Sequence, residues 1–138
     1  RQAGGILRFE DLGWKGIYQL KPFPIYDAAK RLTSGMYIPG SLMCLSFHFK
    51  KHLKIGKGGM ILTDDVAAVE HIKRMRYEGR TENISYHEDI IDEEGWNMYM
   101  TPEEAARGLV LLTDHPEHSP DLIEDPPYRD ITEFNLFK

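Results

Sequence analysis

A cluster of cationic and hydroxyl-bearing side chains follows an apolar run near the middle of the chain. Residues 46–59 read Ser-Phe-His-Phe-Lys-Lys-His-Leu-Lys-Ile-Gly-Lys-Gly-Gly. Lysine ammonium groups cannot enter a core without a partner, so they must face solvent or an anion. The glycines let the backbone approach a ligand or adopt a positive φ. Two interpretations follow: an anion site with a reactive amine, or a basic loop that is simply solvated.

The order of residue types in this segment favours an anion site with a reactive amine. Ser-Phe-His-x-x-Lys-x-Leu, followed by Gly-x-Gly-Gly and an apolar strand, resembles the cofactor-lysine segment of the DegT/DnrJ/EryC1/StrS family. Its members are pyridoxal 5'-phosphate (PLP) aminotransferases that act on nucleotide-linked keto sugars. The resemblance implies that Lys51, and not Lys50, carries the cofactor and acts in catalysis. It also implies that Ser46 binds the cofactor phosphate and that glutamate is the amino donor.

An aspartate stands at the end of a short predicted strand upstream of this segment. Asp27 follows Ile25-Tyr26, and open α/β sheets place ligand-binding groups at the carboxyl ends of their strands. Judged by its residue type and position alone, Asp27 is better suited to cap a helix over residues 28–32. The strand-Asp-Ala-Ala segment resembles the family segment whose aspartate pairs with the PLP pyridine nitrogen. The resemblance therefore implies a catalytic and cofactor-binding role for Asp27, which keeps the ring able to take up electrons.

One position near Asp27 departs from the family pattern. Lys30 stands where family members usually carry glutamine or histidine beside the ring hydroxyl of the cofactor. A cation there disfavours a protonated cofactor through like-charge repulsion. Lys30 is therefore predicted as a cofactor-binding position with altered tuning.

A third motif lies before a predicted helix. Gly-Trp-Asn-Met-Tyr-Met-Thr at residues 95–101 resembles Gly-Tyr-Asn-Tyr-Arg-Met-Thr of the family, with Tyr99 in place of the arginine. The resemblance implies that Asn97 binds the cofactor phosphate of the neighbouring subunit. Judged by its residue type alone, Asn97 is a turn residue.

The elements that must position these residues can be predicted from their patterns. The family resemblance implies an α/β fold, part of the large domain of the type I PLP-dependent transferases (aspartate aminotransferase-like), with a mostly parallel sheet and helices. Thr101, Pro102 and Glu104 predict a capped helix start. Asp64-Asp65 predict the start of another helix. The other expected elements are strands at residues 6–9, 25–26, 42–45 and 58–63, a helix over 65–77, a surface loop over 80–94 and an edge strand within 128–138.

The domain organisation follows from the extent of the resemblance, which runs roughly from residue 25 to 112. We expect residues 1–113 to form a partial large domain and residues 114–138 an extended tail. Family enzymes are longer, and their amino-terminal half supplies further phosphate contacts and an aromatic residue that stacks on PLP. We therefore expect a fragment, half of a split enzyme or a shortened member, completed as a homodimer or by a complementing subunit. Alone, the chain should bind PLP weakly or not at all.

An alternative function is a non-catalytic remnant that serves as a subunit-interaction module. The composition of the chain excludes some classes of protein. Its net charge of −5 argues against a protein that binds nucleic acid or a membrane surface. The single cysteine, Cys44, excludes an internal disulfide and suits a reducing cytoplasm. Adjacent His87, Glu88 and Asp89 rarely converge on one ion, so no metal site is predicted.

Overall fold

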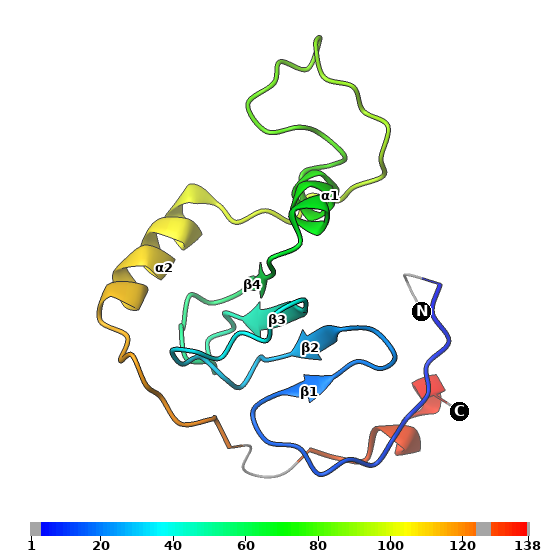
Figure 1. The fold of residues 1–138 in the computed structure, drawn as a ribbon, viewed down its shortest axis with the longest axis vertical. Helices are drawn as coiled ribbons and strands as arrows, with labels where there is room; N and C mark the ends of the chain where they lie inside the picture. Colours follow the sequence, from blue (N-terminus) through cyan, green and yellow to red (C-terminus); the bar gives the residue numbers. More distant parts are fainter. Residues whose placement is uncertain (1–3, 124–127, 138) are drawn as a thin grey trace.

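Four short strands form one sheet at the centre of the molecule. The computed structural model describes residues 4–123 and 128–137. In these ranges the sheet has the order β1-β2-β3-β4 (Figure 1), which is also the order along the chain. The strands are β1 (Tyr18–Gln19), β2 (Ile25–Asp27), β3 (Leu42–Ser46) and β4 (Gly59–Leu62).

The sheet is mixed rather than mostly parallel. β2 and β3 pair in parallel, whereas β1 with β2 and β3 with β4 pair antiparallel. The connection from β1 to β2 spans only residues 20–24. A chain that turns back over so short a connection can only add an antiparallel strand. The predicted strands at residues 25–26, 42–45 and 58–63 are confirmed. The prediction of a mostly parallel sheet is wrong for the part of the chain that the structure describes.

Two α-helices follow the sheet, and both begin at the predicted caps. Helix α1 (Val66–Arg76) starts after Asp65, whose side chain accepts a hydrogen bond from the amide of Ala68. Helix α2 (Pro102–Thr113) has the complete predicted capping box. There, Thr101 accepts from the Glu104 amide and the Glu104 carboxylate accepts from the Thr101 amide. Neither helix is long and apolar enough to cross a bilayer, a statement that holds for residues 4–123 and 128–137.

The helix predicted after Asp27 does not form. Oδ1 of Asp27 accepts a hydrogen bond from the amide of Ala29 at 2.9 Å, and the amide of Ala28 donates to the carbonyl of Cys44. The Asp27 bond is a cap-type contact, and the amide of Arg31 closes a single turn on the carbonyl of Ala28. The turn does not continue as a helix, since the Lys30 carbonyl accepts from the amide of Leu122 in the tail. Residues 28–41 therefore cross from β2 to β3 as a series of turns.

The two ends of the chain also differ from expectation. Residues 6–9 form no strand. The predicted edge strand within residues 128–138 is replaced by two 3₁₀ turns, η1 (Ile131–Glu133) and η2 (Asn135–Phe137); Lys138 lies outside the described residues. The aromatic rings of Phe9 and Phe137 pack edge to face with centroids 5.1 Å apart.

The first part of the tail packs on the turns after β2. The carbonyl of Glu117 accepts from the amide of Ser34, and the amide of Leu122 donates to the carbonyl of Lys30. The Arg31 guanidinium binds both carboxylate oxygens of Asp121 at 2.8 Å. A bidentate pair of this kind is both directional and strong. The division into two units at residue 113 stays a prediction.

The core is small and lies under the loop that connects β3 to β4. Phe47, Leu53 and Ile55 are its buried members. Helix α2 covers them through Gly108, where a side chain would collide with Ile55. Partly buried Leu32, Leu45, Met100 and Leu111 complete the cluster. The loop is therefore held from inside by apolar side chains while its polar residues face outward.

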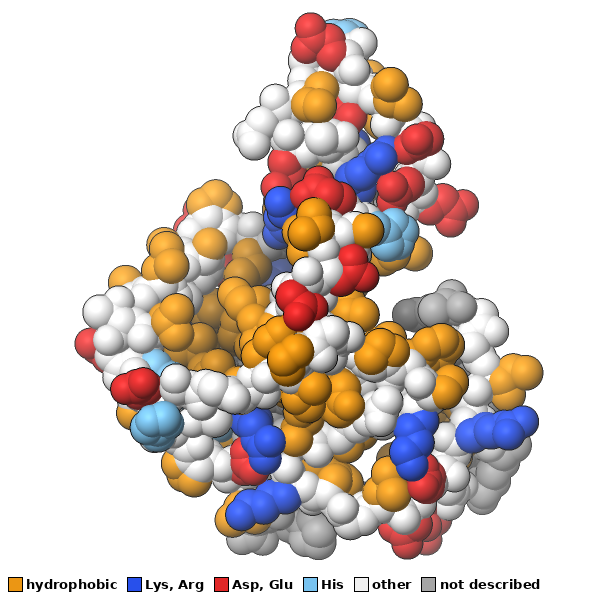
Figure 2. Space-filling view, viewed as in Figure 1, with side chains coloured by type: hydrophobic (Ala, Val, Ile, Leu, Met, Phe, Trp, Pro, Cys, Tyr) orange, Lys and Arg blue, Asp and Glu red, His pale blue; other side chains and the backbone are white. Residues whose placement is uncertain are grey.

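Much apolar surface stays exposed. The chain presents 10762 Å² of accessible surface, whereas a compact monomer of 16.0 kDa presents roughly 7,400 Å². Figure 2 shows hydrophobic side chains gathered between α2 and the sheet. Residues more than 40% exposed in these elements and just before α2 are Met60, Ile61, Trp96, Met98, Tyr99, Leu109, Val110 and Leu112. Soluble monomers avoid contiguous apolar surface of this kind.

Gly79 provides a test of how the long loop packs against α1. Its φ is +79°, it is buried, and a Cβ would collide with the carbonyl oxygen of Glu93. Gly35 has a similar φ of +72° but open space around it. Gly35→Ala should lower the free energy of unfolding by about 1–2 kcal/mol for the left-handed backbone alone. Gly79→Ala should cost roughly 1–3 kcal/mol more because of the collision.

Urea unfolding of the two variants beside the parent chain measures this difference. Equal losses in Gly79→Ala and Gly35→Ala would contradict the close approach of Glu93 to Gly79.

Candidate functional site

Two polar residues end the neighbouring parallel strands. Asp27 is the last residue of β2 and Ser46 the last residue of β3. The pairing sets Asp27 opposite Cys44. Because side chains alternate along a strand, Asp27, Cys44 and Ser46 lie on one face of the sheet. Both carboxyl ends lie at the same edge, the position where open α/β sheets bind ligands.

Two donors hold the Asp27 carboxylate. Oδ1 accepts from the amide of Ala29 and Oδ2 accepts from the hydroxyl of Tyr18, each at 2.9 Å. Tyr18 lies directly opposite Asp27 in the antiparallel β1–β2 pair. Burial, followed by the hydrogen bond to Asp27, raises the pKa of Tyr18 to about 12. The phenol therefore keeps its proton at neutral pH and remains the donor.

Ser46 begins the loop that carries the predicted lysine. Its Oγ accepts from the amide of His48 at 3.3 Å, which leaves the hydroxyl hydrogen to be donated elsewhere. The loop closes where the amide of Phe47 donates to Gly58 and the amide of Gly56 donates to Phe47. The side chain of Ser46 is half-buried at the mouth of this loop.

Lys51 differs from the other lysines of the loop. Its amide donates to the carbonyl of His48 in a tight turn, and the residue is half-buried. Lys50 and Lys54 are exposed, and exposed Lys57 forms an ion pair of 3.6 Å with Glu104. The solvated-loop interpretation therefore describes Lys50, Lys54 and Lys57. Lys51 is the member of the cluster that the turn draws inward.

A histidine ties the lysine loop to the segment after Asp27. Nε2 of His52 lies 3.3 Å from the carbonyl oxygen of Lys30, and the rings of His52 and His115 meet edge to face at 5.8 Å. The pKa of His52 is lowered, chiefly by burial and also by His115. The Lys30 carbonyl and Asp121 oppose this shift. The contact therefore joins His52, which follows Lys51, to Lys30, which lies three residues after Asp27.

Lys30 is buried among aromatic residues. Only 7% of the surface of Lys30 is exposed to solvent. Its Nζ atom lies 4.9 Å from the ring centroid of Trp14 and 4.4 Å from that of Tyr128. Cation–π contacts of this type stabilise an ammonium group away from water. The structure thus places the Lys30 side chain between the amino-terminal segment and the tail.

Asn97 lies apart from the other four predicted residues. It is exposed, it forms a bridge with Tyr77 beyond the end of α1, and its Nδ2 donates to Glu78 at 3.0 Å. In the described residues it makes no hydrogen bond to Asp27, Lys30, Ser46 or Lys51. The structure therefore places Asp27 and Ser46 at two neighbouring strand ends, with Lys51 on the loop that follows Ser46. The side chain of Lys30 packs against aromatic rings, and Asn97 lies at the surface.

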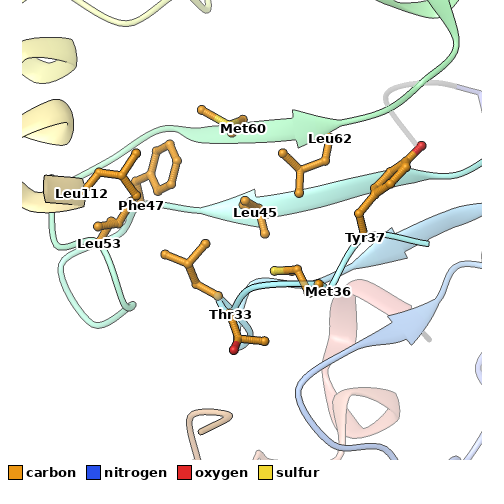
Figure 3. Close-up of a pocket in the computed structure, with 11 residues that line it drawn as sticks. Thr33, Met36, Tyr37, Leu45, Phe47, Leu53, Met60, Leu62 and Leu112 are labelled. Atoms are coloured by element: carbon orange, nitrogen blue, oxygen red, sulfur yellow. The ribbon is translucent and has the colours of Figure 1, made fainter. Parts of the chain in front are cut away.

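Two further features were not predicted from the sequence. An apolar cavity of about 360 Å³ (Figure 3) opens on the opposite face of the sheet from Asp27. Its lining includes Leu45, Met60 and Leu62, whose pairing places them on that face. The second feature is the Tyr18–Asp27 hydrogen bond. Tyr18 and Asp27 are nine residues apart. The two prolines between them are the signal in the sequence that could have indicated a hairpin there.

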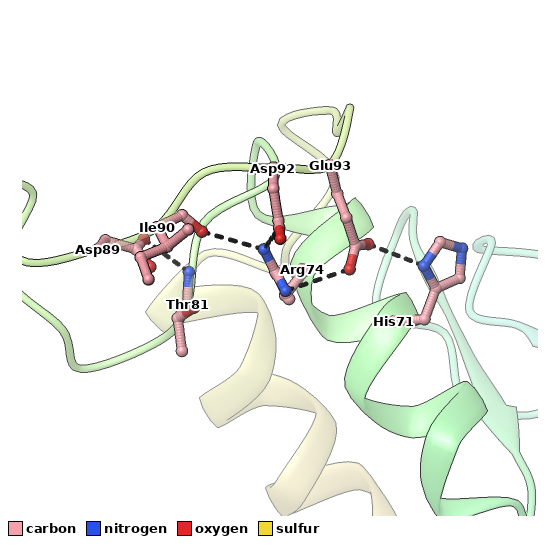
Figure 4. A network of polar contacts seen from close by, with 7 residues as sticks. All are labelled: His71, Arg74, Thr81, Asp89, Ile90, Asp92 and Glu93. Atoms are coloured by element: carbon pink, nitrogen blue, oxygen red, sulfur yellow. Dashed lines mark hydrogen bonds and ion pairs between the residues drawn. The ribbon is translucent and has the colours of Figure 1, made fainter.

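A polar network closes the predicted surface loop over 80–94, which is confirmed as a loop (Figure 4). Glu93 accepts from Arg74 at 3.2 Å and pairs with Nδ1 of His71 at 2.8 Å. Arg74 also pairs with Asp92. The network anchors the loop to α1, and its members are spread along the helix surface rather than around a hollow.

Comparison with known families identifies most of the chain. The model of the DegT/DnrJ/EryC1/StrS aminotransferase family matches residues 34–119, more than half of the 138 residues. Ser46, Lys51 and Asn97 lie within the match, whereas Asp27 and Lys30 precede it. No match is found among curated proteins.

The tether at His52 should be sensitive to pH. Because folding lowers its pKa, the unfolded chain takes up a proton more readily, from about pH 6.5 downward. The contribution of His52 to the free energy of unfolding is fully present above about pH 6.5. It is lost as the pH falls through the pKa that His52 has in the folded chain. His52→Gln keeps an NH donor but does not titrate. We expect it to reduce the loss of unfolding free energy between about pH 7.5 and 5.5.

The matched control is His118→Gln, which changes an exposed histidine of the tail. Denaturant unfolding at the two pH values should show the parent loss unchanged in this variant. Equal pH dependence in the parent chain and in His52→Gln would refute the role assigned to His52.

Proposed function

Because the chain belongs to the DegT/DnrJ/EryC1/StrS aminotransferase family, we propose that it supplies the lysine and the aspartate of a pyridoxal 5'-phosphate site. The reaction would transfer an amino group, with glutamate as donor, to a nucleotide-linked keto sugar. One observation carries the proposal: Asp27 and Ser46 end adjacent parallel strands, and His52 ties the Lys51 loop to the segment after Asp27.

The donor set at this edge suits the proposed cofactor. A carboxylate can hold a protonated ring nitrogen, a hydroxyl can donate to a phosphate, and an amine can form the covalent link. Asp27, Ser46 and Lys51 provide one of each, on neighbouring strand ends and the loop that follows. The backbone of the loop is close-packed here as well, since a Cβ on Gly59 would collide with the carbonyl of Leu45.

The roles of the residues follow from their chemistry. When bound, the cofactor supplies an electron sink for the charge that develops on the substrate carbon. Asp27 would keep a proton on the ring nitrogen, and Ser46 would donate its hydroxyl hydrogen to the phosphate. Nζ of Lys51 would first hold the cofactor and, once released, would move a proton between substrate carbon and cofactor as general acid and base. Histidine replaces this lysine in related sugar dehydratases, so Lys51 favours transamination over deoxygenation.

Lys30 and Asn97 have less direct support. The Lys30 ammonium is held by aromatic rings, and we propose that it tunes the site through its charge. Asn97 is exposed on the same chain, as a residue that acts on a neighbouring subunit must be. We propose that it contacts the cofactor phosphate of a second copy.

A second candidate function is favoured by the exposed apolar surface. The surface excess over a compact monomer is of the order of thousands of Å², and a stable interface buries an area of that order. A non-catalytic subunit-interaction module would use the same surface and would hold no cofactor. A test for covalent attachment of PLP at Lys51 distinguishes the two functions, because only the aminotransferase would carry the cofactor there.

The adjacent lysines provide the test of the proposed function. With PLP in large excess, borohydride should fix the cofactor on the parent chain, and peptide mass spectrometry should locate it on Lys51. Lys51→Ala should abolish the adduct, because the family resemblance assigns the covalent link to this lysine. Lys50→Ala is the matched control and should retain it. An adduct lost in Lys50→Ala and kept in Lys51→Ala would overturn the assignment.

The proposed homodimer has a separate test. We expect light scattering at micromolar concentration to give twice the mass of the chain, since closed two-fold assembly is the commonest way to cover such a surface. Met98→Glu, next to Asn97 and 72% exposed, should shift the protein toward monomer. Ile6→Glu changes a residue that is 92% exposed in the amino-terminal segment and should have no effect. A compact monomer for the parent chain would contradict the proposal.

A further inference from the structure

The hydroxyl of Tyr18 is aimed at the aspartate of the proposed site. β1 and β2 set Tyr18 directly opposite Asp27, and the hydroxyl donates to Oδ2 at 2.9 Å. Oδ1 is held independently by the amide of Ala29 at the same distance. The carboxylate is thus oriented by the backbone on one oxygen and by a side chain on the other.

Other aromatic residues hold the Tyr18 ring in place. The Trp14 ring packs on it with centroids 4.9 Å apart, and the Tyr128 ring stacks near Trp14 at 6.5 Å. The Lys30 ammonium lies over both Trp14 and Tyr128. Segments after β2 and in the tail therefore converge on Trp14, which packs directly on Tyr18. Its hydroxyl is directed by packing and not only by the hydrogen bond.

The surroundings of Tyr18 keep its hydroxyl protonated well above neutral pH. Burial, the hydrogen bond to Asp27 and the charges of Asp27 and Tyr128 all raise its pKa, to about 12. The ammonium group of Lys30 lies over the ring of Trp14, which in turn packs on Tyr18. A phenol that keeps its proton and donates to a carboxylate forms a charge-assisted bond. Oδ2 of Asp27 consequently shares its negative charge with Tyr18.

Resting on the proposed cofactor site, we infer that Tyr18 is a positioning residue that acts through Asp27. Its hydroxyl occupies Oδ2 and weakens the hold of this carboxylate on a protonated pyridine nitrogen. A carboxylate that already receives two hydrogen bonds has less charge to offer a third donor. Tyr18 thereby sets how strongly the site favours the protonated ring.

The sign of the effect follows from which contacts survive when the hydroxyl is removed. Tyr18→Phe keeps the ring and its contact with Trp14, and the Ala29 amide still orients Asp27 through Oδ1. Only the competitor for Oδ2 is lost. A hydrogen bond to a charged group corresponds to one to two decades in affinity. We therefore expect Tyr18→Phe to bind a pyridinium ligand roughly tenfold more tightly than the parent chain.

The probe is 4'-deoxypyridoxine 5'-phosphate, which keeps the ring nitrogen and the phosphate but has no aldehyde to react with Lys51. Binding is followed through the ³¹P resonance of its phosphate, which detects weak complexes. Tyr26→Phe is the matched control, because Tyr26 precedes Asp27 in β2 and points to the other face of the sheet. It should leave the affinity unchanged. In the Asp27→Asn background, Tyr18→Phe should have no effect.

A second readout concerns the protein without ligand. The ¹³Cζ resonance of Tyr18 should titrate near pH 12 in the parent chain and at lower pH in Asp27→Asn. Equal or weaker binding by Tyr18→Phe, or a gain that persists with Asp27→Asn, would overturn the inference while the proposed function stands. Failure of every variant to bind the probe, together with no cofactor fixed at Lys51, would reject the proposed function and this inference with it.

Discussion

The parallel pairing of β2 with β3 is the constraint on which the candidate site depends. It places the carboxyl ends of both strands at one edge, and its register sets Asp27 opposite Cys44. A slip of one residue would turn every side chain of β2 to the other face. Asp27 would then face the apolar cavity instead of sharing a face with Ser46. The antiparallel partners β1 and β4 secure the register from both sides, and β1 also brings the Tyr18 hydroxyl to the carboxylate.

The position of Lys51 depends on contacts below the loop rather than on the lysine itself. Phe47, Leu53 and Ile55 are buried under the loop, and α2 covers them. Arg107 of α2 adds a hydrogen bond to the carbonyl of Ile55 at 3.1 Å. The helix is therefore a support for the loop. Its capping box matters to the site because it fixes where this support begins.

Local signals in the sequence predicted what depends on neighbouring residues. The caps at Asp65 and Thr101, the strand before Asp27 and the lysine loop were all found from short patterns. The helix after Asp27 was mispredicted because backbone groups of this segment bond to the distant tail, where the Lys30 carbonyl accepts from the amide of Leu122. The contacts of Lys30 with Trp14 and Tyr128 join residues far apart in the chain. No local pattern specifies such contacts, since they depend on how the segments pack.

The two faces of the sheet are coupled through the loop. One face carries Asp27 and Ser46, and the other carries the apolar cavity. Phe47 and Leu53 line that cavity and also anchor the lysine loop from inside. Close-packed interiors transmit a change in volume to their neighbours. A change in what fills the cavity therefore reaches the turn that holds Lys51, so the apolar face helps to determine the geometry of the polar one.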